Sequence, residues 1–367
     1  MGSITLATKY ASQVDEVFKL GALTTGITNG NRYDFVGAKT VKVYGMGTAP
    51  MNDYEASGSN RYGDPIELED TTEELTLSQQ RSFSFTIDAT NRIDSPEGVR
   101  DAGIALRRQL DKVVIPELDT YRLKVAATRA KHTVIGAVTT SNAYSMFTDA
   151  TATLNDSEVP DEGRIAYCSN TFVNAIKKCP EYIQASDIAQ NMLIKGQIGE
   201  VDGVAIMRAP KGRMPAGAAF VIIHSEVLTS PVKLAEYRIH ENPPGIAGHL
   251  VEGLVYYDAF ATENKRFGIA VQFSALGDIT LSMTTKKVTA SGSGKLVIGR
   301  NAAGTLKYQT GASITLPKFN EAVGAEWLDV PANGVIAATK GNKVAVVSVV
   351  NGKAVAASAV IDVVVTD

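Results

Sequence analysis

Hydrophobic and polar residues alternate along two stretches of the N-terminal third, which is the pattern of half-exposed β-strands. The first stretch covers residues 40–44. The second covers residues 74–88, where every large apolar residue has an odd number. Two segments with little apolar content, residues 52–65 and 67–74, lie between them. The pattern predicts a long hairpin with an extended polar loop, and a loop of that length is either disordered or functional.

The predicted loop is acidic. Between residues 53 and 74 the chain has eight acids and one base. A solvated loop tip would account for this composition, and so would an arm that reaches onto another subunit, so the sequence leaves both interpretations open. The charged residues concerned are Asp53, Glu55, Arg61, Asp64, Glu67, Glu69, Asp70, Glu73 and Glu74.

A helical period replaces the alternation after residue 95. Ser95, Pro96 and Glu97 predict a helix start, with a capping side chain, a proline at the first position and an acid at the positive end. Apolar residues then recur every three or four positions to about residue 131, with a phase shift that predicts a kink at Pro116.

Basic residues outnumber acidic ones on this helix by eight to five. They form either a solvated face or a face turned toward a polyanion or toward the acidic hairpin of a neighbour. The basic residues are Arg100, Arg107, Arg108, Lys112, Arg122, Lys124, Arg129 and Lys131.

Residues 142–253 mix strand and helix signals. A strand over residues 164–168 leads into a helix that Ser169 or Asn170 caps and Pro180 ends. The other predicted elements are helices over residues 11–20 and 186–195, a strand pair around the turn at 202–203, a buried strand over 218–224, a turn over 242–245, and strands over 251–262 and 267–273 joined by a turn.

The composition changes after Gly277. Residues 278–367 are rich in Val, Ala, Thr and Gly, and turn signals recur at short intervals, as at residues 291–294 and 333–334. Many short strands at this spacing predict a separate β-sandwich of about 90 residues.

Composition excludes several classes of protein. The chain has 367 residues, of which 44% are hydrophobic and 20% charged, with a net charge of −3, so it is a folded protein and not a strongly basic nucleic-acid binder. Two cysteines, Cys168 and Cys179, are too few for a disulfide framework or a four-thiolate zinc site, and two reduced buried thiols are expected. No apolar run approaches the ~20 residues of a membrane span, and no signal peptide is visible, so we expect synthesis in the cytosol and no membrane partner.

Signals of catalysis are missing. The four histidines have no metal-ligand spacing, and the glycines at 45–47 and 294 do not complete a nucleotide-binding motif. No pair of carboxylates stands out for general acid–base chemistry. We therefore predict no catalytic residue, no metal and no cofactor, although a cytosolic enzyme of unrecognised α+β fold remains an alternative.

The order of these elements resembles the HK97-type major capsid protein of tailed bacteriophages. That family has an N-terminal arm, a long flexible hairpin, a long helix and a mixed domain whose last strands return to the helix. Four stretches resemble the family's central-domain elements: residues 164–172, 199–207, 213–217 and 252–259. The resemblance covers about residues 1–277, and the tail, with Trp327 and alternating residues 355–365, resembles a bacterial Ig-like domain.

The resemblance implies an α+β capsid fold followed by an all-β Ig-like sandwich. Its implied parts are an N-terminal arm at 1–36, the E-loop at 37–90, a peripheral domain with the spine helix at 91–139, an axial domain at 140–252, return strands of the peripheral domain at 253–277, and the Ig-like sandwich at 278–367. Lysines lie only at the base of the E-loop, at Lys39 and Lys42, so no covalent cross-link of the HK97 phage type is expected.

The implied function is that of a major capsid protein, which assembles in the host bacterial cytoplasm into the icosahedral shell around double-stranded DNA. The implied partners are further copies in hexamers and pentamers, a separate scaffolding protein, a portal, and weak non-specific contact with packaged DNA; the Ig-like domain would face outward. The alternative is another virion protein with an Ig-like module, such as a tail tube or adhesin component. As the inter-subunit interface we predict Asp53, Glu55, Arg61, Asp64, Glu67, Glu69, Glu73, Glu74, Arg100, Arg107, Arg108 and Lys112.

Overall fold

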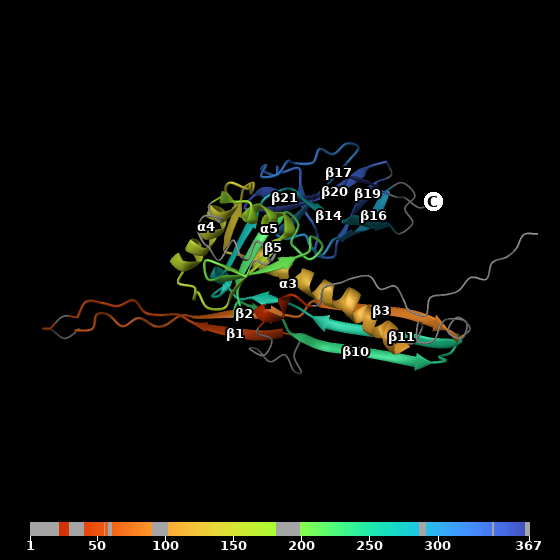
Figure 1. Ribbon diagram of the computed structural model, residues 1–367, viewed down its shortest axis with the longest axis horizontal. Helices are drawn as coiled ribbons and strands as arrows, with labels where there is room; N and C mark the ends of the chain where they lie inside the picture. The colour runs from red at the N-terminus through yellow and green to blue at the C-terminus, as the bar shows by residue number, and fades with distance from the viewer. Residues whose placement is uncertain are drawn as a thin grey trace, which may run out of the picture.

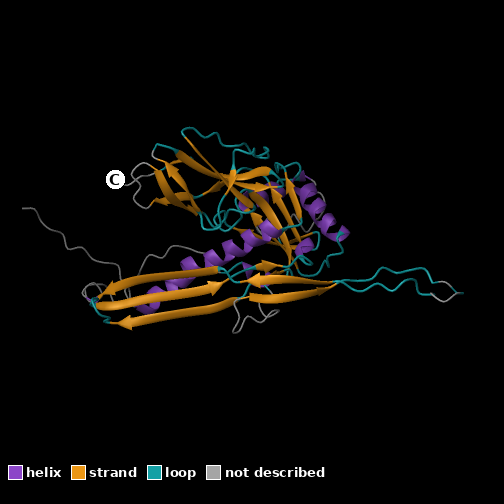
Figure 2. Cartoon of the chain, turned by 180° about the vertical axis from the view of Figure 1, so that it is seen from behind, coloured by secondary structure: helices purple, strands orange, loops and turns teal. Residues whose placement is uncertain are grey.

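The computed structural model describes residues 22–28, 40–54, 56–57, 61–89, 102–180, 199–285, 291–339 and 341–363. The predicted helices over 11–20 and 186–195 and the helix start at 95–97 lie outside these residues. The described chain is a mixed α+β structure with many strands and few helices, as predicted, and Figure 2 shows this composition at a glance.

A two-stranded hairpin projects from one end of the molecule (Figure 1). Its strands β1 (Thr40–Met46) and β2 (Asp70–Thr76) pair antiparallel, which confirms the predicted hairpin. We call residues 40–76 the hairpin arm. The prediction of a single strand over 74–88 is wrong. Strand β2 ends before Leu77 and Ser78, and the chain continues after them as β3 (Gln79–Asp88) in another sheet. Leu77 is fully buried and Ser78 binds a side chain of a different segment, and these contacts turn the chain.

A three-stranded antiparallel sheet carries the long helix. Its order is β10 (Val232–Glu241), β11 (Gly248–Tyr257) and β3. The helix lies along this sheet in Figure 1 as α2 (Ala102–Gln109), a π-helical turn η2 (Leu110–Val114) and α3 (Ile115–Arg129).

The phase shift of the apolar stripe has a different cause from the predicted one. It lies in the π-helical turn, where the N–H of Ile115 donates to the carbonyl of Leu110, five residues earlier. A π turn inserts one extra residue into the helix and so rotates the side chains that follow. Pro116 is the second residue of α3, just beyond this turn, and it has no N–H with which to donate.

A six-stranded sheet forms the central layer, in the order β4 (His132–Ile135), β13 (Ile269–Phe273), β8 (Ala218–His224), β5 (Arg164–Ser169), β7 (Val204–Ala209) and β6 (Glu200–Val201). Its two faces bury different sets of side chains. One face packs against α4 (Ala143–Asp156) and α5 (Asn170–Lys177) through residues such as Phe147 and Phe172. The other packs against α3 through Leu123 and Ala126.

Several predictions are confirmed in this layer. Ser169 caps α5, since its side chain accepts a hydrogen bond from the N–H of Phe172 at 3.3 Å. Strands β6 and β7 flank a turn at Asp202 and Gly203, and both turn residues have positive φ. Strand β8 is buried along nearly its whole length. The two cysteines are free and buried.

The strands predicted over 251–262 and 267–273 do not form a hairpin. Strand β11 ends at Tyr257 and belongs to the three-stranded sheet, whereas β13 belongs to the central sheet. The chain between them makes the short strand β12 (Phe260–Ala261), which pairs with β9 (Leu228–Thr229), and the turn η3 (Arg266–Gly268). A buried aspartate, Asp258, lies directly after β11, and the N–H of its neighbour Ala259 donates to its side chain at 2.8 Å.

The C-terminal residues form two sheets. One runs β14 (Gly277–Ile279), β21 (Lys353–Ser358), β20 (Lys343–Val350), β17 (Thr305–Gly311) and β18 (Leu328–Asp329), with β22 (Ile361–Asp362) beside β20. The other runs β15 (Leu281–Thr285), β16 (Ser291–Ile298) and β19 (Val335–Thr339). Leu296 and Ile336 of the second sheet share a core with Val344 and Val346 of the first, so the predicted sandwich forms.

The sandwich is not separate in its packing. Val355 and Ala303 belong to the same buried cluster as α3 and the central sheet. Gly217 shows how closely the two parts approach: it has φ +80°, and an added Cβ would lie 2.5 Å from the carbonyl oxygens of Ala275 and Val355. The sandwich therefore rests on the rest of the subunit through a continuous core.

Candidate inter-subunit surfaces

The pairing of the hairpin arm determines which side chains share a face. Tyr44 lies opposite Thr72 and Met46 opposite Asp70. Residues directly opposite each other in an antiparallel pair point to the same side, and successive residues point to opposite sides. Continuing this register toward the tip pairs residue 50 with 66 and residue 54 with 62. The rings of Tyr54 and Tyr62 agree with it, because their centroids are 5.3 Å apart.

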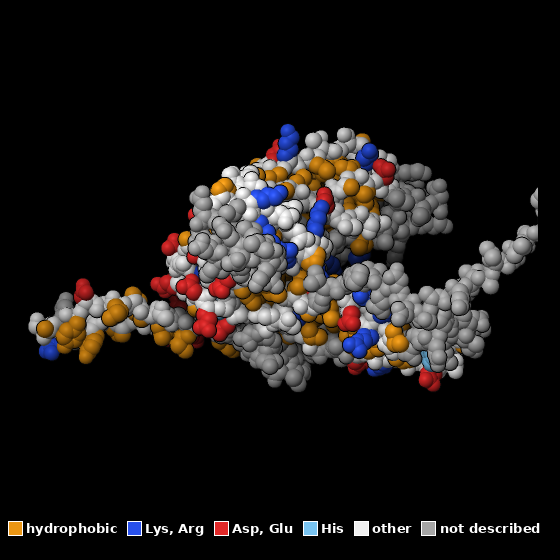
Figure 3. Space-filling view, viewed as in Figure 1, with side chains coloured by type: hydrophobic (Ala, Val, Ile, Leu, Met, Phe, Trp, Pro, Cys, Tyr) orange, Lys and Arg blue, Asp and Glu red, His pale blue; other side chains and the backbone are white. Residues whose placement is uncertain are grey.

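Even-numbered residues of the arm therefore share one face, and between the Lys42–Glu74 pair at its base and Asp64 near its tip this face carries most of the arm's large exposed apolar side chains; we call it the apolar face. Figure 3 shows hydrophobic side chains along one edge of the projecting arm. Their exposed fractions run from 48% for Leu68 to 82% for Tyr62, so the subunit itself leaves them uncovered. The large apolar side chains of this face are Tyr44, Met46, Tyr54, Tyr62, Ile66 and Leu68. The sequence predicted a loop with little apolar content, and this apolar face was not expected.

The predicted acidic residues divide between two environments. Glu67 and Glu69 are exposed on the face opposite Ile66 and Leu68. Glu74 instead forms an ion pair with Lys42 at 2.9 Å, and Glu73 accepts a hydrogen bond from the N–H of Glu263 at 3.1 Å. Glu73 thus attaches the arm to residue 263 of its own subunit, whereas the Lys42–Glu74 pair joins the two strands of the arm to each other.

The remaining predicted acids do not form one continuous patch. Asp53 is exposed near the tip, and Arg61 and Asp64 lie on the returning chain. Asp64 has an even number and so shares the apolar face. Glu55 and Arg100 lie outside the described residues.

The basic half of the predicted interface lies at the other end of the molecule. Arg107 is exposed on α2, 3.9 Å from Asp111, and Arg108 and Lys112 lie beside it in the chain. The arm projects from the opposite end of the subunit (Figure 1), so one subunit does not bring the two charged sets together.

Bases in the second half of the helix are used inside the subunit. Arg122 donates to Thr24 and Ser230, and Arg129 pairs with Glu263 at 3.4 Å. Burial lowers the pKa of Lys124, and the charge of Arg300 lowers it further. The predicted basic face is therefore not a continuous free surface on the described helix.

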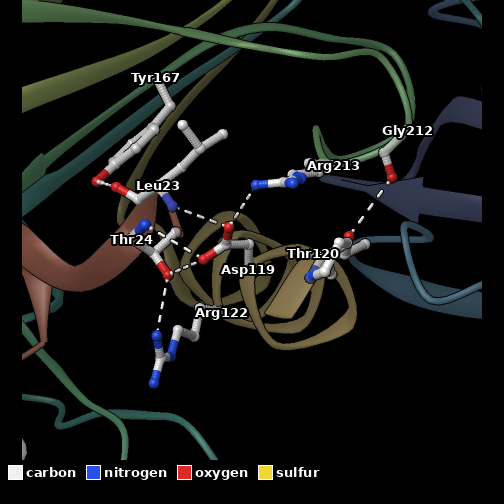
Figure 4. A network of polar contacts seen from close by, with 9 residues as sticks. Leu23, Thr24, Asp119, Thr120, Arg122, Tyr167, Gly212 and Arg213 are labelled. Carbon is white, nitrogen blue, oxygen red and sulfur yellow. Dashed lines mark hydrogen bonds and ion pairs between the residues drawn. The ribbon is translucent and has the colours of Figure 1, made fainter. Parts of the chain in front are cut away.

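A buried carboxylate on α3 holds residues 22–28, which lie within the predicted N-terminal arm. Asp119 is 1% exposed and accepts hydrogen bonds from the N–H groups of Leu23 and Thr24 and from the hydroxyl of Thr24, at 2.5 to 3.2 Å (Figure 4). It also pairs with Arg213 at 2.9 Å. Residues 22–28, which include the 3-10 turn η1 (Thr24–Ile27), are thereby attached to the helix, and we call them the N-root.

A second buried carboxylate holds the base of the hairpin arm. Asp258 is 3% exposed and accepts from the N–H and hydroxyl of Ser78 at 2.8 and 2.9 Å. The hydroxyl of Tyr121 donates to it at 2.7 Å, and burial followed by this bond raises the pKa of Tyr121. We call Leu77 and Ser78 the hairpin root. Neither carboxylate was predicted from the sequence, although an acid beside the apolar stripe at position 119 was a signal for one of them.

The described residues offer little for catalysis. Among them, no group of three or more His, Cys, Asp or Glu side chains is placed to hold a metal ion. No helix in the described part of the chain is long and apolar enough to cross a membrane.

Comparison with solved structures identifies the fold. Mycobacterium phage Che8 gives a TM-score of 0.59 at 16% identity over 73% of this chain and 96% of that chain. The mature capsid of bacteriophage PhiM1 gives 0.56 at 11% identity, over 74% of this chain and 92% of that chain, and the capsid of cyanophage P-SCSP1u gives 0.57 at 10% identity, over 73% and 93%. This chain has the fold of phage capsid proteins.

The capsid fold accounts for about three quarters of the chain, because the three matches cover 73–74% of it. Nearly the whole of each matched capsid chain is covered. The remaining quarter has the size of the C-terminal sandwich, residues 278–367 of 367. No family model and no curated protein matches the sequence.

Proposed function

We propose that this chain is an HK97-type major capsid protein that assembles into the icosahedral shell around the double-stranded DNA of a tailed phage. The exposed apolar face of the hairpin arm is the observation that carries the proposal. Six large apolar side chains are exposed on an arm that projects from the rest of its own subunit, and large exposed apolar patches mark interaction sites. A second copy of the same chain is the occupant that the capsid fold favours.

Typical free energies of burial and of ion pairing favour the apolar face over the charged face as the source of binding energy. Fully burying a large apolar side chain contributes about 1.5–3 kcal/mol, whereas an exposed ion pair contributes about 0–1 kcal/mol. Glu67 and Glu69 then set register and association rate more than affinity. This revises the predicted interface, in which acidic residues of the arm and Arg100, Arg107, Arg108 and Lys112 of a neighbour made the contact.

The test replaces the apolar face without disturbing the base of the arm. Substituting Tyr54, Ile66 and Leu68 together by serine removes large exposed side chains far from the subunit core. We expect a folded subunit with unchanged thermal unfolding that forms no shells when expressed under assembly conditions, as judged by electron microscopy. Shells of normal size from this variant would overturn the assignment of the interface.

The matched control changes the opposite face. Glu67→Lys with Glu69→Lys reverses two exposed charges that have no role in holding the base of the arm. We expect shells to persist, with assembly slowed at low salt because charge reversal acts mainly on the association rate. Complete loss of assembly in the control, together with normal assembly of the serine variant, would restore the charged interface.

The partners follow from the same proposal. Copies would associate as hexamers and pentamers, with a separate scaffolding protein and a portal, and contact with packaged DNA would be weak. Assembly would take place in the host bacterial cytoplasm, and no enzymatic activity is proposed. Expression of the wild-type chain under the same conditions distinguishes the alternative, a tail tube or adhesin component, since tubes or single subunits in place of closed shells from the unchanged chain would favour it.

The C-terminal sandwich is proposed to be Ig-like and to face outward. Its strand order supports the first part: β15, β16 and β19 correspond to strands A, B and E of an immunoglobulin domain, and β17, β20 and β21 correspond to C, F and G. Antibody labelling of intact particles tests the second part, because an inward-facing domain would stay unlabelled until the shell is opened.

A further inference from the structure

One turn of α3 carries the contacts of both arm roots. Asp119 binds the N-root, and two residues later Tyr121 donates to Asp258, which binds the hairpin root. Arg122 lies on the same turn and is half-buried. Figure 4 shows Asp119 between the N-root and Arg213, with Arg122 reaching Thr24.

Arg122 connects the two carboxylate sites. Its Nη1 donates to the hydroxyl of Thr24 at 3.1 Å, and its Nε donates to the hydroxyl of Ser230 at 2.8 Å. Ser230 in turn donates to the backbone carbonyl of Asp258 at 2.9 Å. Thr24, Ser230 and Asp258 are all at most 5% exposed, so water does not compete readily for these bonds.

We infer that this polar chain, from Asp119 through Thr24, Arg122 and Ser230 to Asp258, couples the two roots, so that release of one loosens the other. When the N-root leaves, Asp119 loses the donors of Leu23 and Thr24, and Arg122 loses an acceptor. Departure of the N-root uncovers the carboxylate of Asp119. The guanidinium of Arg122 is then attracted to that carboxylate and moves away from Ser230. Ser230 no longer orients Asp258, and Ser78 is held less firmly.

The coupling is a property of the single subunit. Its consequence, that docking of one arm on a neighbour sets the order of the other, rests on the proposed function. Buried polar chains of this kind are worth more than their separate bonds, and only paired substitutions measure the excess.

The experiment measures amide hydrogen exchange of the full-length unassembled chain, with substitutions at each end of the polar chain. Thr24→Val keeps the shape of the side chain and removes its hydroxyl. We expect it to raise exchange at residues 77–79 at least threefold, besides its direct effect on residues 22–28. Ser78→Ala should raise exchange at residues 22–28 by a similar factor.

A third variant interrupts the connection itself. In an Arg122→Met background, where the side chain keeps an unbranched apolar stem and loses its donors, the transferred effects of Thr24→Val and Ser78→Ala should disappear. Effects that stay confined to their own root in the wild-type background, or that persist undiminished with Arg122→Met, would overturn the coupling.

Two controls separate coupling from general loss of stability. Thr128→Val makes the same substitution on α3, outside the polar chain, where the hydroxyl contacts Lys124 and Gly304, and it should leave both roots unchanged. Amides of β8, in the centre of the molecule, should keep their exchange rates in every variant. Because exchange is read on single subunits, failure of the coupling and failure of shell assembly are independent results.

Discussion

Asp119 shows how one buried charge can specify the position of a chain segment. A buried carboxylate is costly unless it is paired and hydrogen-bonded. Asp119 meets this requirement with Arg213 and with the N–H groups of Leu23 and Thr24, and only the observed position of the N-root supplies the last two. Asp258 does the same for Ser78 at the hairpin root.

Substituting Asp119 by asparagine should therefore be severe. The amide keeps the shape of the side chain, yet it leaves Arg213, 6% exposed at its side chain, without its buried counter-charge. We expect the free energy of unfolding to fall by about 3–5 kcal/mol, the range for breaking a buried ion pair. Urea unfolding followed by circular dichroism measures the loss.

Asp111→Asn is the matched control for this measurement. Asp111 pairs with Arg107 on the surface of the same helix at 3.9 Å, and both side chains are more than half exposed. An exposed pair four residues apart contributes about 0.3–0.5 kcal/mol. Equal losses for the two substitutions would show that burial of the Asp119 pair has no special weight.

At the scale of elements, regular patterns predicted structure and irregular ones did not. Strand β8 and the hairpin strand β1 followed from continuous and alternating apolar residues. Helix α4 was missed because its sequence is rich in threonine, serine and alanine, and packing of Phe147 and Leu154 stabilises it. Strand β10 was missed because its apolar residues change parity within the strand, from Val232 and Leu234 to Tyr237 and Ile239, so no single alternation runs through it.

The candidate interface was predictable in its charge and not in its faces. Acidic residues are visible directly in the sequence of the arm. The apolar face appears only when the register is known, because Tyr44 and Met46 join Ile66 and Leu68 on one side through antiparallel pairing. A stretch without contiguous apolar residues can thus build a contiguous apolar surface.

The π-helical turn gives a prediction for the long helix as an element. Deleting Asp111, an exposed residue of this turn, removes the extra residue and rotates α2 by about 100° relative to α3. Side chains of α2 that now face the sheet would turn away from it, and we expect a loss of about 2–4 kcal/mol, comparable to losing a large buried side chain. Thermal unfolding of the deletion variant is compared with that of Asp111→Ala, which keeps the number of residues in the turn. Equal stability of the two variants would contradict the prediction.

At the scale of the molecule, the sandwich is joined to the capsid fold at several points. Arg300 donates to Gln79 of β3 at 2.6 Å and lies 3.7 Å from Glu117 of α3. Thr128 accepts from the N–H of Gly304 at 3.1 Å, and Lys211 pairs with Asp278 at 2.9 Å. The sandwich thus touches the three-stranded sheet, the helix and the central layer together, so it holds their relative positions in addition to any role on the particle surface.

A chain ending at residue 276 should consequently be unstable. The truncation removes Ala303 and Val355 from the main core cluster, and Val355 is fully buried, so burial worth several kcal/mol is lost with the ion pairs of Arg300 and Lys211. We expect the midpoint of thermal unfolding to fall by about 10 °C and a hydrophobic dye to bind the exposed surface. Arg300→Gln, which keeps the sandwich, should lower the midpoint only slightly. A truncated chain with the wild-type midpoint would show that the sandwich is an independent appendage, and loss of shells by that chain would then have to come from a contact of the sandwich with a neighbour.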